Sequence, residues 1–583
     1  MSEATTVPDS SSPGGVKYWR SLEQLENTAE FQAIVDREFA DGAAEAPDEV
    51  SRRGFLGVIA ASVALAGLTS CRKPVTHILP FNARPEGFKP GIAQYYATTL
   101  SRGGYGLGVL VRSNDGRPTK IEGNPLHPSS LGGSDAFLQG EILQLYDPAR
   151  SRMPSGPVEA AAEEAALHGE AAGHEEHASG AAARTYDQFR RWWATVARAL
   201  VLKQGEGLRL LVPPTTSRSL QYWQTKVTEN FPKARFHTWE PIHRDAENAG
   251  SQMALGRVVD TQIHFGNADV VVSFDCDFLA LDGANLRHAR HWAQRRKLRQ
   301  PGDKIARLYV AESCFSTTGT MADHRFRMRN ADTIAAVFAL AGKLGLAGEL
   351  GTELQAHKAD AFVRGGKNWI DAVARDLQQS KGRGVVVAGP RQPAVVHAVV
   401  HAINAALDAV GKTITYTATP APLAQSQVES IAALKRDVDA GQVEVLVCLG
   451  TNPVYDAPAD LQFKKLLADK KVKHTIHVGL YKDETGQHCD WHFNAAHDLE
   501  SWGDAQAHDG TVSLRQPLIA PLHGGISAVE FLALLTDQPN LEALVAERDG
   551  AYGHQLVKDF WKASSGSPTF DSWWKQSLHD GVV

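Results

Sequence analysis

The sequence predicts an α/β protein, with a small β-rich N-terminal domain ahead of two Rossmann-like lobes built on parallel sheets. From Tyr186 onward, short apolar runs alternate with segments of helical period. Repeated β–α units imply parallel strands with helices on both faces of the sheet. The chain has 583 residues, too many for one core, and its 43% hydrophobic and 22% charged residues are typical of folded globular proteins.

The expected strands and helices follow one another from residue 186 to residue 478. The strands are expected at 208–212, 270–274, 308–311, 385–388, 443–449 and 475–478. The helices are expected at 186–203, 217–230, 284–299, 331–344, 393–410, 425–440 and 459–469. We place one lobe at 186–345 and the second at 346–535, followed by a helical C-terminal segment at 536–583.

Two segments without helical period precede the lobes. Residues 72–157 contain frequent turn signals, among them Gly103-Gly104 and Asn114-Asp115-Gly116, which break up apolar runs and predict the small β-rich domain. Residues 158–185 consist largely of Ala, Glu, Gly and His, which predicts a solvated linker. We treat the histidines of this linker as solvated and assign no metal site to them.

An export signal is predicted at residues 51–71. Arg52 and Arg53 form a twin-arginine pair, and the uncharged run 54–70 that follows is shorter than a membrane-spanning helix. The run ends in Leu-Thr-Ser-Cys, the order of a lipobox, so Cys71 is expected to become a lipidated N-terminus. The alternative is a buried amphipathic or core helix that ends at an ordinary cysteine. Residues 1–50 form a leader with helical period, either a docking segment or a disposable extension.

Charge and cysteine content exclude two classes of function. The formal net charge of -6 argues against a nucleic-acid partner, because such binding needs clustered cations. The five cysteines include no C-x-x-C pair and no C-x-x-C-H haem site. We therefore expect the cysteines other than Cys71 to be buried and free, with no iron–sulfur cluster in this chain.

Three stretches carry more specific information than their periodicity. Residues 450–453, Gly-Thr-Asn-Pro, form a turn at the carboxyl end of a strand, where doubly wound sheets bind ligands. Residues 115–128 read DGRPTKIEGNPLHP, and residues 475–521 carry Glu484-Thr485, Cys489-Asp490, Leu499-Glu500, Gly503-Asp504 and Gly510. Together these stretches resemble the molybdopterin oxidoreductase superfamily over most of residues 92–535. The resemblance implies interleaved α/β domains around a long funnel that holds two pterin nucleotides.

The departures from that superfamily bear on the cofactors. Where cluster-carrying members place four cysteines around the DGR stretch, this chain has none. The region 236–250, where the metal-ligating Cys, selenocysteine or Ser falls, has no thiol, although Glu240 or Asp245 offers an oxygen. The turn after the first strand of the lobes is Pro213-Pro214, which removes two amide donors where a phosphate would bind. We therefore expect no cofactor-binding, metal-binding or catalytic residue in this chain.

A narrower resemblance concerns the leader, the late signal, and residues 269–299 and 310–327. These resemble the large iron–sulfur subunit of alternative complex III, a bacterial quinol oxidoreductase. In that family the half that resembles a pterin enzyme carries no molybdenum, and a ferredoxin-like half carries the clusters. The resemblance implies an iron–sulfur half or chain, a multihaem cytochrome c subunit and quinol-binding membrane subunits as partners. It also implies either a split subunit or only the first half of one.

Three histidine-containing segments are given structural interpretations. His397 and His401 have the i, i+4 spacing of a zinc pair but lack the expected Glu and a third ligand, so we expect a core-facing or partly exposed pair. The helix that carries His288 and His291 continues into a basic run to Arg299, interpreted as a solvated face or a docking face for an acidic partner. His488, Cys489 and His492 are assigned to an ordinary loop without metal.

The function expected from the sequence is that of a cofactor-free scaffold subunit in a membrane-bound quinol:electron-acceptor oxidoreductase of respiratory or photosynthetic electron transfer. The chain would be lipid-anchored on the periplasmic side of the bacterial inner membrane. Two alternatives remain open at this stage. One is an exported molybdenum-dependent oxidoreductase that uses an oxygen ligand, and the other is a stand-alone lipid-anchored binding protein. The fold alone does not choose between them, because function is determined by the site.

Overall fold

The computed structural model describes residues 91–157, 181–346, 362–364, 367–421, 423, 425–536 and 551–583, together with Glu26, Thr28, Ala29 and Lys89. The helices and strands given below belong to the compact unit Phe88–Val583. All but three residues of the predicted leader lie outside the described residues, as do Arg52, Arg53, Cys71 and most of the predicted linker. Among the described residues, no helix combines the length and the apolar character that crossing a membrane requires.

The N-terminal domain is a three-stranded antiparallel sheet of β1 (Gln94–Arg102), β2 (Tyr105–Asn114) and β3 (Arg117–Gly123). The β-rich character predicted for this segment is confirmed. A helix that we did not predict, α4 (Ala136–Leu145), follows the sheet and begins at Asp135, whose side chain accepts a hydrogen bond from the Leu138 N–H. Aliphatic side chains of β2 and β3 pack with Leu138 and Leu145 to form a small core.

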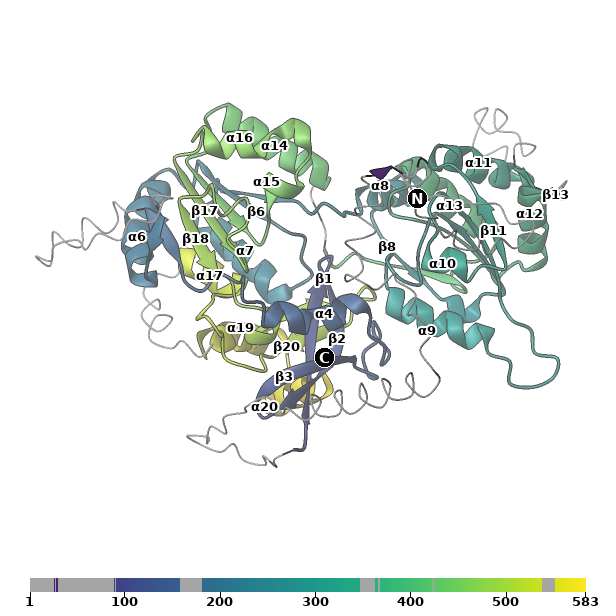
Figure 1. The fold of residues 1–583 in the computed structure, drawn as a ribbon, viewed down its shortest axis with the longest axis horizontal. Coiled ribbons are helices and arrows are strands. Elements are labelled where there is room, and N and C mark those ends of the chain that lie inside the picture. Colours follow the sequence, from purple (N-terminus) through teal and green to yellow (C-terminus); the bar gives the residue numbers. More distant parts are fainter. Residues whose placement is uncertain are drawn as a thin grey trace, which may run out of the picture. The chain divides into compact units, whose positions relative to one another are not determined.

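The first lobe is built on a seven-stranded sheet in the order β5-β4-β18-β17-β16-β6-β7. Its strands β6, β17 and β18 are labelled in Figure 1. Its five central strands are parallel: β6 (Leu208–Val212), β7 (Arg235–Thr238), β16 (Val445–Leu449), β17 (His474–Gly479) and β18 (Trp491–Asn494). Two short antiparallel strands, β4 (Ser155–Pro157) and β5 (Ala181–Ala183), complete one edge.

Helices cover both faces of this sheet because alternate side chains of each buried strand point to opposite faces. One face packs against α6 (Tyr186–Leu202), α7 (Arg218–Asn230) and α17 (Ala528–Thr536). The other face packs against α14 (Gln427–Asp439) and α16 (Phe463–Ala468), with the short α15 (Pro453–Asp456) beside them. Residues Leu210 and Leu211 of β6 illustrate the alternation, since each belongs to a different core.

The second lobe is built on a four-stranded parallel sheet in the order β11-β10-β9-β14. Its strands are β9 (Val270–Phe274), β10 (Arg307–Glu312), β11 (His324–Arg327) and β14 (Gly384–Ala388). Its helices are α8 (Asp245–Leu255), α9 (Asn285–Arg296), α10 (Thr317–Thr320), α11 (Thr333–Lys343), α12 (Trp369–Gln379) and α13 (Ala394–Ala406). Two small antiparallel pairs flank it: β8 (Asp260–Ile263) with β15 (Ile414–Thr417), and β12 (Val363–Arg364) with β13 (Lys367–Asn368).

Sheet membership does not follow the boundary that we placed near residue 345. After β6 and β7 of the first lobe, the chain forms the sheet of the second lobe. The next strand, β16, belongs to the first lobe again and pairs directly with β6. β14, which lies beyond residue 345, pairs with β9 of the second lobe. The physical reason is that local periodicity specifies the type of an element, whereas strand neighbours are set by long-range pairing. The interleaving agrees with what the superfamily resemblance implied.

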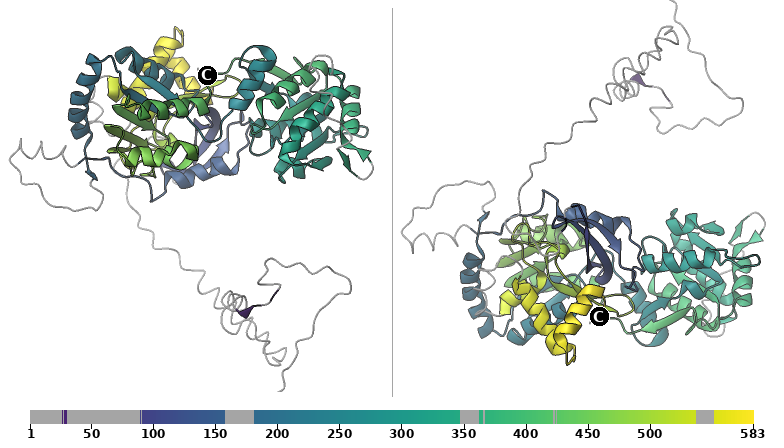
Figure 2. Two further views of the ribbon diagram at one scale, coloured as in Figure 1. Left: turned by 90° about the horizontal axis from the view of Figure 1, so that it is seen from above. Right: turned by 90° about the horizontal axis from the view of Figure 1, so that it is seen from below.

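The C-terminal segment returns to the N-terminal sheet. β19 (Gly503–Gln506) and β20 (Val512–Arg515) form an antiparallel pair, and α19 (Ala551–Ser564) and α20 (Phe570–Asp580) follow. Figure 2 shows these yellow helices beside the dark blue β1–β3 sheet, and Asn124 Nδ2 donates to the Asp580 carbonyl at 2.7 Å. His127 is buried between Ser513 Oγ (2.6 Å) and Ser129 Oγ (2.7 Å). The EGNPLHP stretch therefore fastens the two ends of this unit together.

Candidate functional site

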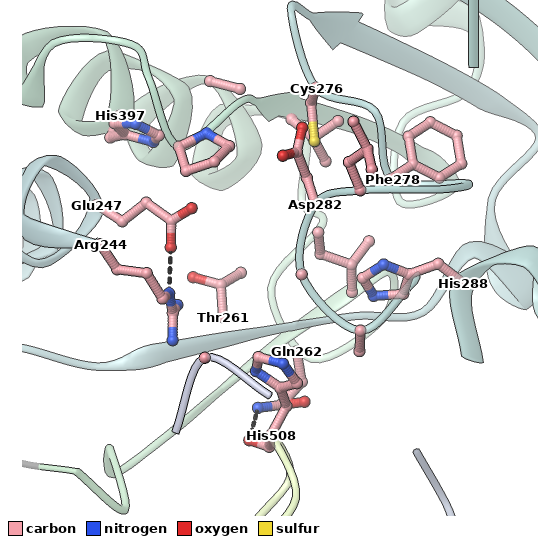
Figure 3. Close-up of a pocket in the computed structure, with 18 of the residues that line it drawn as sticks. Arg244, Glu247, Thr261, Gln262, Cys276, Phe278, Asp282, His288, His397 and His508 are labelled. Atoms are coloured by element: carbon pink, nitrogen blue, oxygen red, sulfur yellow. Dashed lines mark hydrogen bonds and ion pairs between the residues drawn. The ribbon is translucent and has the colours of Figure 1, made fainter. Parts of the chain in front are cut away.

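Two adjoining cavities lie at the inner ends of the lobes. The large cavity, of about 490 Å³, is lined mainly by the second lobe and by residues near the β1–β2 turn, and Figure 3 shows its walls. The small cavity, of about 340 Å³, lies at the carboxyl ends of β6, β16 and β17 in the first lobe. Gly103 and Glu240 line both cavities. The position of the small cavity matches the general rule that doubly wound sheets bind ligands at the carboxyl ends of their strands.

Glu240 is the carboxylate shared by the two cavities. It follows Trp239, a buried residue directly beyond β7 whose indole N–H donates to Asp456 Oδ1 at 2.9 Å. Burial and, to a smaller extent, the nearby Asp456 carboxylate together raise the pKa of Glu240 to about 7. Glu240 therefore changes charge near neutral pH. Of the two oxygen donors considered from the sequence, it is the one that the structure places at the cavities.

Asp245, the other oxygen donor, lies elsewhere. It begins α8 and does not line either cavity. Its Oδ2 accepts a hydrogen bond from the Val428 N–H at 3.2 Å and lies 3.4 Å from His243 Nδ1. These contacts assign Asp245 a structural position between α8 and the start of α14.

A charged network forms one wall of the large cavity. The Tyr105 hydroxyl donates to Asp260 Oδ2 at 2.8 Å, and Arg244 donates to the other oxygen of Asp260 at 3.1 Å. Arg244 Nε also donates to Glu247 Oε2 at 2.6 Å, the ion pair drawn in Figure 3. Burial raises the pKa of the Tyr105 hydroxyl well above its usual range. Tyr105 therefore remains a neutral hydrogen-bond donor, and the Arg244 charge is balanced within the network.

Two buried histidines line the same cavity. The His508 ring stacks on Tyr105 with centroids 3.8 Å apart and planes inclined by 15°. The His288 ring packs edge-on against Phe265 at 5.0 Å, and neither of its nitrogens has a hydrogen-bond partner among the described residues. Burial lowers the pKa of both histidines, and Arg287 contributes to the shift at each. Both imidazoles are therefore neutral at physiological pH.

Arg287 shares this wall with the two histidines. Its Nη2 donates to Gln262 Oε1 at 2.8 Å, and its Nη1 lies 3.7 Å from Asp509 Oδ2. Arg287 and His288 thus face inward from α9, which corrects part of our interpretation of the basic run. Arg295 and Arg296, further along the same helix, pair with Asp269 and Asp323 of their own lobe rather than being fully solvated.

His397 and His401 on α13 line the large cavity opposite α9, as the i, i+4 spacing allows. Burial lowers the pKa of His401 to about 4, with the neighbouring His397 adding to the shift. Glu247 lies near both rings and favours their charged forms. Over the described residues, no group of three or more His, Cys, Asp or Glu side chains is arranged to hold a metal ion.

The cysteines within the described residues are free. Cys276 and Cys448 are buried and Cys489 is half-buried, whereas Cys314 is exposed in the loop after β10. Exposure of Cys314 differs from our expectation of buried thiols. Cys71 lies outside the described residues.

The small cavity contains the predicted strand-end turn. Gly450 lines it with a φ of 69°, a left-handed conformation that favours glycine, and Thr451 beside it is buried. Pro213 and Pro214, at the end of β6, also line it, and Pro213 lies next to Gly450. Asp504 lines it as well and is buried, with an exposed fraction of 2%. Gly450 and the Gly503-Asp504 pair, which carry the superfamily resemblance, therefore line one cavity together with the proline turn.

Sequence reasoning missed most residues of the large cavity. Tyr105, Thr261 and His508 line it from three distant segments, and of these only His508 lies in a stretch, 475–521, that carries the superfamily resemblance. One signal was available, because residues 236–250, where a metal ligand was sought, contain both Glu240 and Arg244. The region was correctly located, but its role in an internal ion-pair network depends on contacts that a sequence pattern does not encode.

Comparisons with known proteins agree with this architecture. No profile of a known protein family matches the chain. A stretch of 115 residues is 35% identical to the menaquinone reductase, molybdopterin-binding-like subunit, of Nitratidesulfovibrio vulgaris. This stretch covers 18% of the present chain and spans only 16% of the relative's length.

Among solved structures, acetylene hydratase from Pelobacter acetylenicus is similar with a TM-score of 0.56 and 13% sequence identity. The match covers 78% of this chain and 70% of the hydratase. At that identity the likeness concerns the fold. The small antiparallel N-terminal sheet, the parallel-sheet lobes and the structural match together confirm the predicted α/β fold class, which this chain shares with acetylene hydratase.

Proposed function

We propose that this chain is a cofactor-free scaffold subunit of a membrane-bound quinol:electron-acceptor oxidoreductase of the alternative complex III type. The local match to a subunit of menaquinone reductase supports a place in a quinone-linked complex. The sequence resemblance to the alternative complex III subunit supports the narrower assignment. In the small cavity, a carboxylate and a proline turn of this chain lie where a phosphate would bind, which supports the absence of a pterin nucleotide.

The observation that carries this proposal is the position of Asp504. The N-terminus of α7 directly follows the β6 turn, where a doubly wound sheet would hold the phosphates of a nucleotide. Here the Asp504 carboxylate accepts hydrogen bonds from Ser217 Oγ at 2.8 Å and from the Ser219 N–H at 3.2 Å. The Trp561 indole N–H holds its second oxygen at 2.9 Å. The chain's own buried carboxylate thus takes the place of a phosphate.

The turn before α7 is also unsuited to phosphate. Pro213 and Pro214 provide no amide donors. The Gly103-Gly104 turn lies against them, since a Cβ on Gly104 would approach the Pro214 carbonyl oxygen to 2.8 Å. Thr216 donates both its amide and its hydroxyl to the Gly104 carbonyl. The N-terminal hairpin therefore closes this strand end with backbone, and the residues present do not fit a pyrophosphate there.

The cations around both cavities are already neutralised. Each arginine that lines them lies within 4.0 Å of a carboxylate of this chain, and no lysine appears among the lining residues. The pairs are Arg102 with Asp135, Arg244 with Glu247 and Asp260, Arg287 with Asp509, Arg391 with Asp275 and Asp282, and Arg515 with Asp498. An anionic dinucleotide would have to compete with these internal carboxylates. Because the arginines that line the two cavities are already paired with carboxylates, these cavities are better suited to a structural role than to binding an anionic cofactor.

The remaining parts of the proposal come from the sequence. Arg52 and Arg53 would direct export, and Cys71 would anchor the mature chain by its lipid to the periplasmic side of the inner membrane. Iron–sulfur clusters and haems would belong to partner chains, an iron–sulfur half or chain and a multihaem cytochrome c. Quinol would bind to integral membrane subunits beneath. The present chain would hold these partners in position.

An alternative function is favoured by one specific observation, the position of Glu240 between the two cavities. An exported molybdenum oxidoreductase that uses an oxygen ligand would need such a carboxylate at the junction of its two nucleotide sites. The Glu240 oxygen fits that requirement, whereas the phosphate-binding positions described above do not. We therefore keep the enzyme as the second candidate and derive no reaction step from it.

The proposal is tested by isolating the chain from membranes with its partners. A tag at the C-terminus and a mild detergent should recover a complex that contains a multihaem cytochrome c and an iron–sulfur protein and oxidises quinol. Mass spectrometry of the same preparation should find a mature N-terminus at an acylated Cys71. A tagged chain that purifies alone and retains an unmodified Cys71 thiol would contradict both the scaffold and the anchor. Isolation alone with a lipidated Cys71 would instead indicate a stand-alone binding protein.

A further inference from the structure

Two buried histidines lie side by side in the first lobe. His477 of β17 and His492 of β18 are register partners, with exposed fractions of 1% and 2%. Their rings are nearly parallel, at 18°, with centroids 5.2 Å apart. The two Nδ1 atoms are 2.9 Å apart, which is the distance of an N–H···N hydrogen bond. Only one of the two nitrogens carries a hydrogen, because two N–H groups would repel each other at this separation.

Each ring has a second partner at its far nitrogen. His477 Nε2 lies 3.4 Å from Asp483 Oδ1, and His492 Nε2 lies 2.7 Å from Ser151 Oγ. Ser151 belongs to the loop after α4, and Asp483 to the loop after β17. The four side chains thus form a continuous row that runs through the buried pair and ends at a half-buried residue on each side.

The Asp483 carboxylate sets the direction of this row. Burial raises the pKa of Asp483, but its hydrogen bonds with His477 and with the Gly486 N–H outweigh burial and lower it. An ionised carboxylate only accepts hydrogen bonds, so His477 carries its hydrogen on Nε2 and accepts at Nδ1. His492 then donates from Nδ1 and accepts at Nε2 from the Ser151 hydroxyl. The hydrogens on the Ser151 hydroxyl, His492 Nδ1 and His477 Nε2 therefore all point along the row toward Asp483.

Two glycines provide the space for the pair. A Cβ on Gly486 would lie 2.9 Å from His477 Nδ1 and 3.2 Å from His492 Nδ1, so this residue covers the N···N contact directly. A Cβ on Gly479 would lie 2.6 Å from the His477 ring. The loop between these glycines therefore passes over both imidazoles without a side chain that would separate them.

The charged groups that face the pair keep His492 neutral. Burial, followed by His477 and Lys482, lowers the pKa of His492 to about 3, while Asp483 acts in the opposite direction. Lys482 itself reaches across to Ser155 Oγ at 3.3 Å. A neutral imidazole both accepts and donates a proton, whereas a permanently charged one only donates. His492 is therefore in the state that proton transfer requires.

We propose that Ser151, His492, His477 and Asp483 form a proton relay that transmits protonation between the two ends of the row. A proton that arrives at the Ser151 end binds His492 Nε2. The Nδ1 hydrogen of His492 then passes to His477 Nδ1, and the Nε2 hydrogen of His477 passes to Asp483. Each passage takes up one proton at His492 and delivers one proton to Asp483, and no electrons are transferred. Because each passage reverses both tautomers, a passage in the opposite direction restores them.

The Asp483 end of the relay lies toward the cavities. The charge of Asp483 contributes to raising the pKa of Asp456, and the charge of Asp456 contributes to raising the pKa of Glu240. Asp456 is held by Trp239, the neighbour of Glu240 in the chain. Glu240, which titrates near pH 7 between the two cavities, is therefore electrostatically linked to the relay. The relay itself rests on the three contacts described above, between Ser151 and His492, between the two histidines, and between His477 and Asp483. It does not depend on the proposed function.

The test uses the full-length chain labelled with ¹⁵N-histidine and nuclear magnetic resonance. The wild-type protein should show a scalar coupling between His477 and His492 Nδ1 across the hydrogen bond, with hydrogens on His477 Nε2 and His492 Nδ1. The informative variant is Ser151→Asp, which places an acceptor at both ends of the row. The pair should then bind one extra proton at neutral pH, so that the His477 Nδ1 signal moves toward the position of a protonated nitrogen.

His477 is the readout because Ser151 contacts only His492. A spectrum in which Ser151→Asp changes His492 but leaves His477 unchanged would overturn the relay. The control is Ser155→Asp, which adds a negative charge beside Lys482 rather than at His492 Nε2 and should leave both tautomers as in the wild type. If Ser151→Asp does not fold, the wild-type spectrum still decides, since the opposite tautomers or the absence of N–N coupling would contradict the proposal.

Discussion

Arg150 and Glu500 form a bidentate ion pair that is fully buried between the loop after α4 and the segment before β19. The two N–O distances are 3.1 and 2.6 Å, and the side chains are 1% and 0% exposed. Glu500 also accepts the N–H groups of His497 and Leu522, each at 2.9 Å. Because every oxygen has a partner, this pair fixes how the N-terminal domain meets the first lobe.

Removal of one partner from this pair should be costly. Arg150→Met should lower the free energy of unfolding by about 3 to 5 kcal/mol, because it leaves a buried carboxylate without its counter-charge. Chemical denaturation of the purified chain measures this change. The double variant Arg150→Met with Glu500→Leu should lose less than the single variant, since no charge remains buried. Equal losses in the two variants would show that packing, rather than the unpaired charge, dominates.

Glu240 should make stability depend on pH. Its pKa is about 7 in the folded chain against an ordinary value of 4.5, so the folded state binds this proton more tightly. The contribution to stability is therefore complete below pH 4.5 and is lost as the pH rises through 7. At pH 8, Glu240→Gln should raise the free energy of unfolding by up to about 3 kcal/mol over the wild type, measured by chemical denaturation. At pH 4.5 the two proteins should differ little.

Glu247 provides the matched control for that experiment. Burial raises its pKa, but Arg244 outweighs burial and lowers it, so its contribution to stability is present at neutral pH and is lost on acidification. Glu247→Gln should therefore destabilise the chain at pH 8, opposite in sign to Glu240→Gln. Two variants that respond alike would show that the Glu240 carboxyl is not held in its proton-binding state.

Gly108 should not tolerate a side chain. A Cβ at this position would lie 2.2 Å from His127 Cγ, and the His127 ring is held on both sides by serine hydroxyls. Gly108→Ala should lower the free energy of unfolding by about 3 kcal/mol, because a ring fixed in this way cannot move aside without losing its hydrogen bonds. Gly140→Ala on α4 is the control: nothing lies within 4 Å of its Cβ, and it should gain up to about 1 kcal/mol. A neutral Gly108→Ala would show that the ring has room to shift.

Asp504 should be needed for the fold of the small cavity. Asp504→Ala removes an acceptor shared by Ser217, Ser219 and Trp561, and should cost about 1 to 3 kcal/mol. Thermal unfolding of the variant measures this cost. If added pyrophosphate raises the melting temperature of Asp504→Ala but not of the wild type, the carboxylate occupies an anion site, as we argue. A wild type that is itself stabilised by pyrophosphate would contradict that assignment.

The elements of the lobes could be predicted because each is encoded locally. The buried strands β6, β9 and β16 are continuous aliphatic runs, and α7 begins at Ser217, a strong N-cap residue. α4 was missed because its sequence, AFLQGEILQL, has little amphipathic period and contains a glycine. The division into lobes was misplaced because the pairing of β6 with β16 joins residues more than two hundred positions apart.

The candidate site was predicted less completely than the fold. Gly450 and Asp504 were marked by the resemblance, and Glu240 by the search for a missing metal ligand. Tyr105, Arg244 and Asp260 could not be predicted as a unit, because an ion-pair network is formed by side chains from separate elements. The inward orientation of Arg287 and His288 could not be predicted either, because a run of basic residues on a helix usually indicates a solvent-exposed face.

The central claim, that the funnel of this chain is inherited in shape but holds no cofactor, is tested most directly by its pterin and metal content. The complex should be purified anaerobically, its chains separated, and each analysed for molybdenum, tungsten and iron and for pterin released by acid oxidation. The account predicts no stoichiometric molybdenum, tungsten or pterin with this chain and iron only with its partners. One or two pterins per chain, with molybdenum or tungsten, would contradict it and make Glu240 the first residue to substitute.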